Sequence, residues 1–353
     1  MTSRVRRLRR LLERSGVDSL LVTDLSNVRY LCGYSGSNGA MLVAPNTSWF
    51  YTDFRYQEQV KTEVRGCRVK TISRGLFTDF PVEHTRSIKR LGVESANLTL
   101  AVHNALKRRL KGVRLVPLKT DLVLELRRCK DADEVKAIEA AQRVTDRVFN
   151  DILGIIRPGI SERELAAEIT YRFSLRGENA FRPIVASGPN GAKPHAGSTD
   201  RKLRKGDAVT FDIGCQRNGY SSDMTRTVFV GRIDPDLRQV YDIVLEAQLR
   251  GLAAVRHGLA CRDADEAARG FIRNAGYGPY FGHGLGHGVG IDVHEAPAVA
   301  HTSKQTLTAG DVVTVEPGIY LPGFGGVRIE DMVLVTRDGC RNFTRSPKKL
   351  IQL

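Results

Sequence analysis

The sequence predicts an α+β protein of two domains, a smaller α/β domain over residues 1–125 and a larger domain over residues 126–353. A chain of 353 residues is long enough for about two domains. Hydrophobic residues make up 41% and charged residues 26% of the chain, as in globular proteins, which excludes a disordered or fibrous protein. The boundary is placed near residue 125, because short alternating elements give way there to one long amphipathic helix.

Short apolar runs and helical periodicity alternate in the first domain. Residues 19–23 and 40–43 are apolar and are followed by turn residues, so they are predicted to be buried strands. Residues 53–64 and 98–110 carry apolar side chains at helical spacing and are predicted to be helices. This pattern predicts an α/β domain, and it contains no obvious chemical motif.

Long helices open the second domain. Apolar residues recur at helical spacing from residue 132 to about residue 156, which predicts an amphipathic helix. Ser161 and Glu164 have the spacing of a capping box and predict the start of a second helix. A strand-rich, glycine-rich region ends the chain. The other helices predicted before that region are residues 235–257 and 262–275.

The net charge of +15 raises the question of nucleic-acid binding. Of this charge, +11 falls within residues 1–125, in helix-like segments where arginine alternates with apolar residues. Such a pattern is typical of a solvated helix face. Because no zinc-finger spacing, aromatic stacking motif or helix-turn-helix pattern accompanies it, a nucleic-acid partner is not expected.

The cysteines and the apolar segments indicate where the protein acts. The six cysteines are scattered and never form C-x-x-C, which favours separate reduced thiols over disulfides or a thiolate metal site. No stretch approaches the roughly 18 uninterrupted apolar residues of a membrane helix. The arginine-rich start is not followed by the apolar core of a signal peptide. We therefore expect a soluble, cytoplasmic protein without a membrane partner.

Two aspartates are predicted to face each other on a hairpin. Residues 208–214 and 220–230 alternate as strands, and a four-residue loop over 216–219 would join them. In that register Asp212 lies opposite Asp223, with Cβ atoms about 5 Å apart. Like charges so placed are destabilising unless a cation lies between them. A metal site and an exposed hairpin with two solvated aspartates are both compatible with this pattern.

Further acids and histidines occur toward the end of the chain. Glu316 ends an apolar strand, and Glu330 shares a strand face with Arg328 because side chains alternate with a period of two. Four histidines fall between residues 283 and 301, where glycine occupies every second position from 282 to 290. Taken alone, each acid also fits a solvated strand end, and each histidine also fits a structural role.

Together these residues resemble the pita-bread metallopeptidases, specifically the proline peptidase branch that contains aminopeptidase P and prolidase. The resemblance covers the whole second domain, and Pro194-His195 agrees with it as well. It extends more loosely to the first domain, where residues 51–56 are similar to the amino-terminal domain of short bacterial members. The implied fold is a pita-bread domain preceded by a creatinase-like α/β domain. The matching segments are residues 211–214, 223–227, 283–295, 315–318 and 326–331.

The resemblance implies two divalent metal ions in the second domain. Asp223 and Glu330 would bridge both ions, and four carboxylates would balance the charge of the two ions. Because four of the five ligands donate oxygen, Mn²⁺ is expected, with Co²⁺ or Zn²⁺ as alternatives. The implied ligands are Asp212, Asp223, His287, Glu316 and Glu330.

The same resemblance implies hydrolysis of a peptide bond. Two metal ions would activate a water molecule and polarise the scissile carbonyl group. Glu316 would accept a proton from that water, and His195 and His294 would stabilise the tetrahedral intermediate or pass the proton to the leaving nitrogen. Catalytic roles are thus expected for His195, His294, Glu316 and Arg328. Substrate binding is expected for His283, His294 and Arg328, with Arg328 donating two parallel hydrogen bonds.

The substrate implied by this branch is a peptide with proline in the second position, cleaved before the proline. The amino-terminal motif favours an Xaa-Pro aminopeptidase, and an Xaa-Pro dipeptidase (prolidase), which accepts only dipeptides, is the alternative. A non-catalytic binding protein of the same fold is a weaker alternative, because such proteins typically lose ligands and all five are present here. The resemblance also implies a homodimer.

Overall fold

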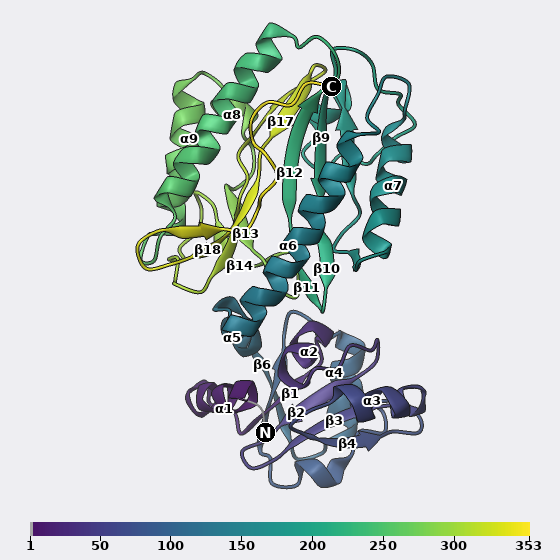
Figure 1. Ribbon diagram of the computed structural model, residues 1–353. Helices are drawn as coiled ribbons and strands as arrows, with labels where there is room; N and C mark the ends of the chain where they lie inside the picture. The colour runs from purple at the N-terminus through teal and green to yellow at the C-terminus, as the bar shows by residue number, and fades with distance from the viewer. Residues whose placement is uncertain (1–2) are drawn as a thin grey trace. The chain divides into compact units, whose positions relative to one another are not determined.

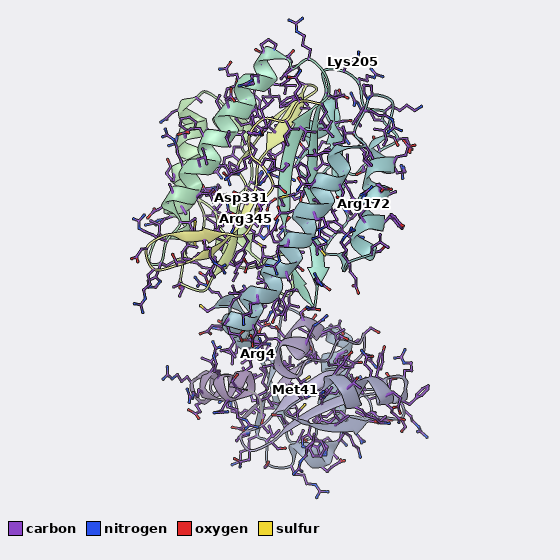
Figure 2. The ribbon with its side chains drawn as sticks, viewed as in Figure 1. Arg4, Met41, Arg172, Lys205, Asp331 and Arg345 are labelled. Atoms are coloured by element: carbon purple, nitrogen blue, oxygen red, sulfur yellow. The ribbon has the colours of Figure 1, made fainter. Side chains whose placement is uncertain are left out.

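Residues 3–353 are described by a computed structural model, in which the chain divides into two units between Arg127 and Arg128. A six-stranded mixed sheet forms the first unit, in the order β4-β3-β2-β1-β5-β6 (Figure 1). The central strand β2 is buried throughout, including Met41, which is labelled in Figure 2. The strands are β1 (Ser19–Val22), β2 (Ala40–Val43), β3 (Ser48–Thr52), β4 (Arg68–Thr71), β5 (Arg90–Glu94) and β6 (Arg114–Leu118).

The helices of the first unit begin and end at recognisable caps. Asp24 accepts a hydrogen bond from the backbone N–H of Asn27 at the start of α2, and Gly33 ends that helix with a φ of 89°. The helix predicted over residues 53–64 begins as a 3₁₀ turn, whereas the strands and the other helix form as predicted. The elements are α1 (Ser3–Ser15), α2 (Leu25–Cys32), η1 (Phe54–Tyr56), α3 (Gln57–Glu63), η2 (Val82–Thr85) and α4 (Leu100–Arg109), with α5 (Leu122–Arg128) at the boundary.

Two pairs of helices, α6 with α7 and α8 with α9, pack on the strands of the second unit (Figure 1). The predicted capping box of Ser161 and Glu164 is confirmed at the start of α7, and Asp131 forms a second one with Glu134 before α6. No helix within residues 3–353 has both the length and the apolar character that a membrane crossing requires. The bounds are α6 (Ala132–Leu153), α7 (Glu162–Ser174), α8 (Pro235–Ala254) and α9 (Cys261–Asn274), with short turns η3 (Gly188–Ala192) and η4 (Gly278–Tyr280).

The strands of the second unit form several small sheets, ordered β12-β9-β8, β14-β13-β15-β18-β19, β11-β10-β7 and β16-β17. The first two sheets carry most of the segments with predicted site residues. The strands are β7 (Glu178–Asn179), β8 (Ile184–Ser187), β9 (Ala208–Ile213), β10 (Cys215–Arg217), β11 (Tyr220–Ser221), β12 (Met224–Phe229), β13 (Gly286–Gly288), β14 (Glu295–Val299), β15 (Val312–Val315), β16 (Gly318–Leu321), β17 (Gly325–Arg328), β18 (Asp331–Val335) and β19 (Cys340–Asn342).

The predicted register of the aspartate hairpin is wrong by two residues. Asp212 lies opposite Thr225, not opposite Asp223, which precedes β12. The loop has two residues rather than four, because Asn218 and Gly219 both adopt positive φ values, of 53° and 79°. This conformation matches the twist of a tight hairpin and is typical of the Asn-Gly dipeptide.

Behind the site strands, Arg226 holds a buried network together. Its guanidinium group donates to Asp331 Oδ1 at 2.8 Å, and both side chains are almost inaccessible to solvent. Asp331 also accepts from Asn342 and Lys348, each at 2.6 Å. The remaining Arg226 hydrogen bonds go to the carbonyl oxygens of Thr225, Glu330, Ser346 and Pro347.

Replacing Arg226 with leucine should lower the free energy of unfolding by about 3–5 kcal/mol, because it leaves a buried charge without its main partner. Urea unfolding followed by circular dichroism measures the change. The matched control is Arg238→Leu, since Arg238 pairs with Asp242 on the surface with side chains 55% and 54% exposed. That control should cost less than about 1 kcal/mol. Equal losses in the two variants would contradict the structural role of Arg226.

Candidate metal centre and active site

A cavity of about 560 Å³ in the second unit collects all of the predicted site residues. Its polar wall is formed by acids, imidazoles and the guanidinium groups of Arg182 and Arg328. An apolar wall, with Phe181, Ile184 and Val293, lies beside them. The predicted residues that line it are His195, Asp212, Asp223, His283, His287, His294, Glu316, Arg328 and Glu330.

Strand pairing brings the acids together from distant parts of the chain. Asp212 is the last but one residue of β9, and Asp223 directly precedes the neighbouring strand β12. In the second sheet, Val315 of β15 pairs with Asp331 of β18, so Glu316 and Glu330 lie where that ladder ends. The backbone N–H of Glu330 donates to the carbonyl oxygen of Thr225 on β12, which connects the two sheets at this point.

His287 lies among these carboxylates. Its Nε2 atom is 3.3 Å from Glu316 Oε1 and 3.6 Å from Asp223 Oδ2. Its Nδ1 atom is 3.1 Å from the carbonyl oxygen of Gly288, which can only accept, so Nδ1 carries a proton. The Nε2 atom therefore faces the acids. One ligand atom each from Asp223, His287 and Glu330 lie within 4.8 Å of one another.

Two carboxylate oxygens at this site lack hydrogen-bond partners. Asp223 Oδ1 and Glu330 Oε1 are both buried, and within residues 3–353 neither accepts a hydrogen bond. A buried charge without a partner is costly, and a divalent cation would compensate it. Several carboxylates and one imidazole form a donor set that hard or borderline divalent ions accept. The residues present therefore fit a metal centre.

The pKa values of the acids reflect their crowding. Burial raises the pKa of Asp223 well above its usual value, and the negative charge of Glu330 raises it further. Burial and the charge of Glu316 likewise raise the pKa of Glu330. Burial acts in the same direction on Glu316, but the hydrogen bond with His287 and the charges of His287, His283 and Arg328 together outweigh it and lower that pKa to about 2. Without a cation, therefore, Glu316 stays ionised, and its negative charge helps to raise the pKa values of Asp223 and Glu330.

Two threonines that sequence reasoning missed orient the acids. Thr225 Oγ1 donates to Glu330 Oε2 at 2.7 Å, and Thr314 Oγ1 donates to Glu316 Oε1 at 3.0 Å. Thr314 also accepts from the backbone N–H of His287 at 3.0 Å. The sequence could have indicated these threonines, because each lies in a strand two residues from a predicted metal ligand.

Arg328 is held by the protein itself. Four of its five N–H donors are engaged, which leaves one for a substrate rather than the two parallel donors that the sequence predicted. The hydroxyl of Tyr320, also missed by the sequence, accepts from Arg328 at 2.8 Å and lies 2.9 Å from His283 Nε2. The acceptors of Arg328 are Thr225 Oγ1, the carbonyl oxygen of Pro194, the Tyr320 hydroxyl and Asp212 Oδ2.

His195 and His294 present exposed rings at the cavity. The His294 ring centroid is 4.1 Å from that of His287, and partial burial together with the charge of His287 lowers the pKa of His294. His195 lies on a loop, residues 188–199, whose shape depends on Glu162. This fully buried carboxylate accepts five hydrogen bonds of 2.7–2.9 Å. Their donors are the backbone N–H and hydroxyl groups of Ser187 and Thr199 and the Asn190 amide.

Comparison with known proteins identifies the family. Residues 136–337 match Metallopeptidase family M24, and residues 4–129 match the Creatinase/Prolidase N-terminal domain. The chain belongs to metallopeptidase family M24. It is therefore a metal-dependent peptidase, and the predicted α+β fold, a pita-bread domain after a creatinase-like domain, is confirmed.

Solved structures and a curated relative cover almost the whole M24 chain. An Xaa-Pro dipeptidase from Bacillus anthracis is 40% identical with a TM-score of 0.96, and the match covers 99% of each chain. An X-Pro aminopeptidase from Thermotoga maritima is 34% identical with a TM-score of 0.91, over 98% of this chain and 100% of that one. The Xaa-Pro dipeptidase of Pyrococcus horikoshii is 33% identical over 99% of each chain.

Asp223→Asn should stabilise the protein without metal and remove most of its response to metal. The raised pKa means that ionised Asp223 opposes folding, so stability falls as the pH rises above the usual range of carboxyl groups. At pH 8 with a chelator, the neutral amide should therefore raise the free energy of unfolding by about 1–3 kcal/mol. Thermal unfolding with chelator and then with Mn²⁺ measures both effects.

The control is Asp242→Asn, which removes the same charge from the exposed face of α8. This control should leave unchanged both the melting temperature without metal and its rise on adding Mn²⁺. If Asp223→Asn instead responded to Mn²⁺ as strongly as the unmodified protein, Asp223 would not be part of the metal centre.

Proposed function

We propose that this M24 peptidase is an Xaa-Pro dipeptidase with a centre of two divalent ions. The observation that carries the proposal is the convergence of four carboxylates and one imidazole in one cavity, with two buried oxygens that have no hydrogen-bond partner among residues 3–353. The proposed ligands are Asp212, Asp223, His287, Glu316 and Glu330. Mn²⁺ is the proposed metal, because most of these donors are oxygens. A cytoplasmic location and a homodimer stay predictions.

The substrate class is supported by the named relatives and by the cavity. The Bacillus anthracis and Pyrococcus horikoshii proteins are both named Xaa-Pro dipeptidases. The Thermotoga maritima protein is an X-Pro aminopeptidase. Aminopeptidase activity, which the sequence favoured, is therefore the second candidate function. A proline ring is apolar and its amide bond has no N–H, so apolar contacts must position it. Phe181, Ile184 and Val293 offer such contacts in the cavity.

Arg182 supports the choice of dipeptides. It is exposed on the cavity wall, and within residues 3–353 it forms no hydrogen bond or ion pair. A dipeptide places its terminal carboxylate one residue beyond the cleaved bond, and a guanidinium group binds a carboxylate with two parallel hydrogen bonds. Arg328, with one donor left, cannot provide that contact. We assign carboxylate recognition to Arg182.

The chain's own groups would position the substrate and move protons. When bound, the divalent ions supply a Lewis-acid centre that activates water and polarises the scissile carbonyl group. Glu316, whose Oε1 atom lies 3.3 Å from His287 Nε2, is the proposed acceptor of a proton from that water. His294 and His195 both line the cavity, and either imidazole can take up a proton there and pass it to the leaving nitrogen.

A series of substrates tests the dipeptidase assignment. Ala-Pro should be hydrolysed with a kcat/KM at least about tenfold above that of Ala-Pro-Ala or Ala-Pro-amide, because only the dipeptide pairs its carboxylate with Arg182. Arg182→Ala should raise KM for Ala-Pro about tenfold and leave Ala-Pro-amide unchanged. Equal rates for Ala-Pro and Ala-Pro-Ala would favour the aminopeptidase instead.

Glu162→Gln tests whether the loop of His195 must be held in place. The amide nitrogen would face hydrogen-bond donors, so the loop should shift and kcat for Ala-Pro should fall at least about tenfold. Metal content should not change, because Glu162 contacts none of the proposed ligands. Glu164→Gln, two residues further along α7, is the control and should keep the normal kcat. Normal kcat in Glu162→Gln would refute the role of the loop.

A further inference from the structure

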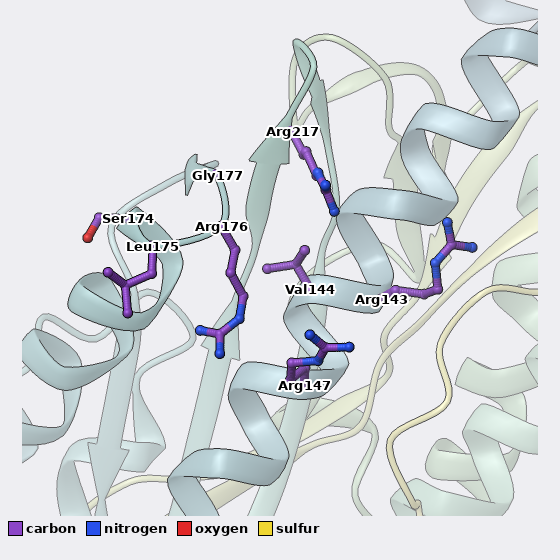
Figure 3. Close-up of a pocket in the computed structure, with 8 residues that line it drawn as sticks. All are labelled: Arg143, Val144, Arg147, Ser174, Leu175, Arg176, Gly177 and Arg217. Atoms are coloured by element: carbon purple, nitrogen blue, oxygen red, sulfur yellow. The ribbon is translucent and has the colours of Figure 1, made fainter.

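The second unit, residues 128–353, is the catalytic unit. It has a second cavity, of about 540 Å³, that is lined by arginines. Helix α6 contributes Arg143 and Arg147, the segment after α7 contributes Arg176, and β10 contributes Arg217 beside its tight turn. Figure 3 shows the guanidinium groups of Arg147, Arg176 and Arg217 extending toward the space around Val144, with Arg143 on the other side of that residue. The eight lining residues include no acid and none of the predicted active-site residues.

The positive charge of this cavity is weakly compensated. Within residues 3–353, the side chains of Arg147 and Arg217 form neither a hydrogen bond nor an ion pair. The contacts of the other two arginines are long and partly exposed, so they contribute little. They are Arg143 with Glu139 at 4.0 Å, Arg176 with Asp151 at 3.9 Å and Arg176 with the Arg172 carbonyl oxygen at 3.2 Å.

We propose that this arginine cavity binds a small anion with two or more linked phosphate groups, such as a nucleoside polyphosphate. The planar guanidinium fork matches phosphate oxygens, and several forks around one space match several linked phosphates. The volume lies within the range of about 300–1,000 Å³ that is typical of small-molecule sites. Leu175, which is 61% exposed, adds apolar surface that a nucleoside can contact.

The shape of the site favours a small molecule over a nucleic-acid strand. Single-stranded nucleic acid is typically bound along an extended basic groove with aromatic side chains for base stacking. None of the eight lining residues is aromatic, and the arginines surround one hollow. The phosphate chemistry is shared by both ligands, so the experiment must separate them.

Titration calorimetry of the metal-loaded, full-length protein with inorganic tripolyphosphate and with ATP tests the proposal. Both should bind with one ligand per chain, and Arg147→Ala/Arg217→Ala should weaken binding at least tenfold. Arg238→Ala/Arg250→Ala is the matched control, because it removes two exposed arginines from α8. The affinity of this control variant for both ligands should stay within twofold of the affinity of the unmodified protein. Arg217→Ala alone, at the exposed hairpin turn, should weaken binding at least threefold and serves if the double variant does not fold.

Two further measurements keep this site separate from the proposed peptidase site. Asp223→Ala should bind tripolyphosphate as tightly as the unmodified protein, which would exclude chelation by the metal centre as the source of the signal. The arginine double variant should hydrolyse Ala-Pro at the normal rate, so a failure of the anion site and a failure of the proposed function are distinguishable.

Three results would overturn the proposal. One is the absence of tripolyphosphate binding at 1 mM, or equal binding by the two double variants. Another is orthophosphate binding as tight as that of tripolyphosphate, because linked phosphates would then not be recognised. The third is a single-stranded oligonucleotide that binds more tightly than ATP and is lost in the same variant, which would assign the surface to nucleic acid.

Discussion

Repulsion among buried carboxylates is the constraint on which the catalytic unit depends. One cavity is lined by four carboxylates, those of Asp212, Asp223, Glu316 and Glu330. Their mutual repulsion lowers the stability of the fold unless other groups compensate the charge. The protein compensates part of the charge itself, because Arg328 pairs with Asp212 at 2.6 Å and His287 with Glu316 at 3.3 Å. Asp223 and Glu330 each keep one oxygen without a hydrogen-bond partner in the described part of the chain. The uncompensated negative charge is therefore concentrated at Asp223 and Glu330, where a cation would bind.

Glu330 and Asp331 show how the fold separates a reactive acid from a structural one. They are consecutive in sequence and both are buried, but alternation along the strand sends their side chains to different surroundings. Burial raises the pKa of both groups, yet Arg226 and Lys348 outweigh it at Asp331 and lower its pKa. At Glu330 the neighbouring positive charges do not outweigh burial, so the pKa of Glu330 is raised. The difference comes from partners and not from burial.

The sequence predicted the kinds of residue at the site better than it predicted their contacts. Charged residues in apolar strands and alternating glycines marked the acids and most of the histidines as candidates, and the resemblance to the pita-bread metallopeptidases implied their roles. The register of Asp212 and Asp223 was wrong because the loop length was judged from strand patterns, whereas the Asn218-Gly219 turn sets it. Tyr320 was missed because its role depends on contacts with His283 and with Arg328 of β17, which no local pattern encodes.

The same physical criterion separates the arginine cavity from the rest of a basic surface. Many exposed arginines of the catalytic unit, such as Arg163 with Asp200 at 2.7 Å, have a close acidic partner, and their charge is then compensated locally. Arg147 and Arg217 have none within residues 3–353, although they face the same hollow from α6 and β10. Like charges brought together around open space indicate a ligand of opposite charge. The acids of the catalytic cavity and the arginines of the second cavity thus each concentrate charge of one sign around open space, and each cavity favours a ligand of the opposite sign.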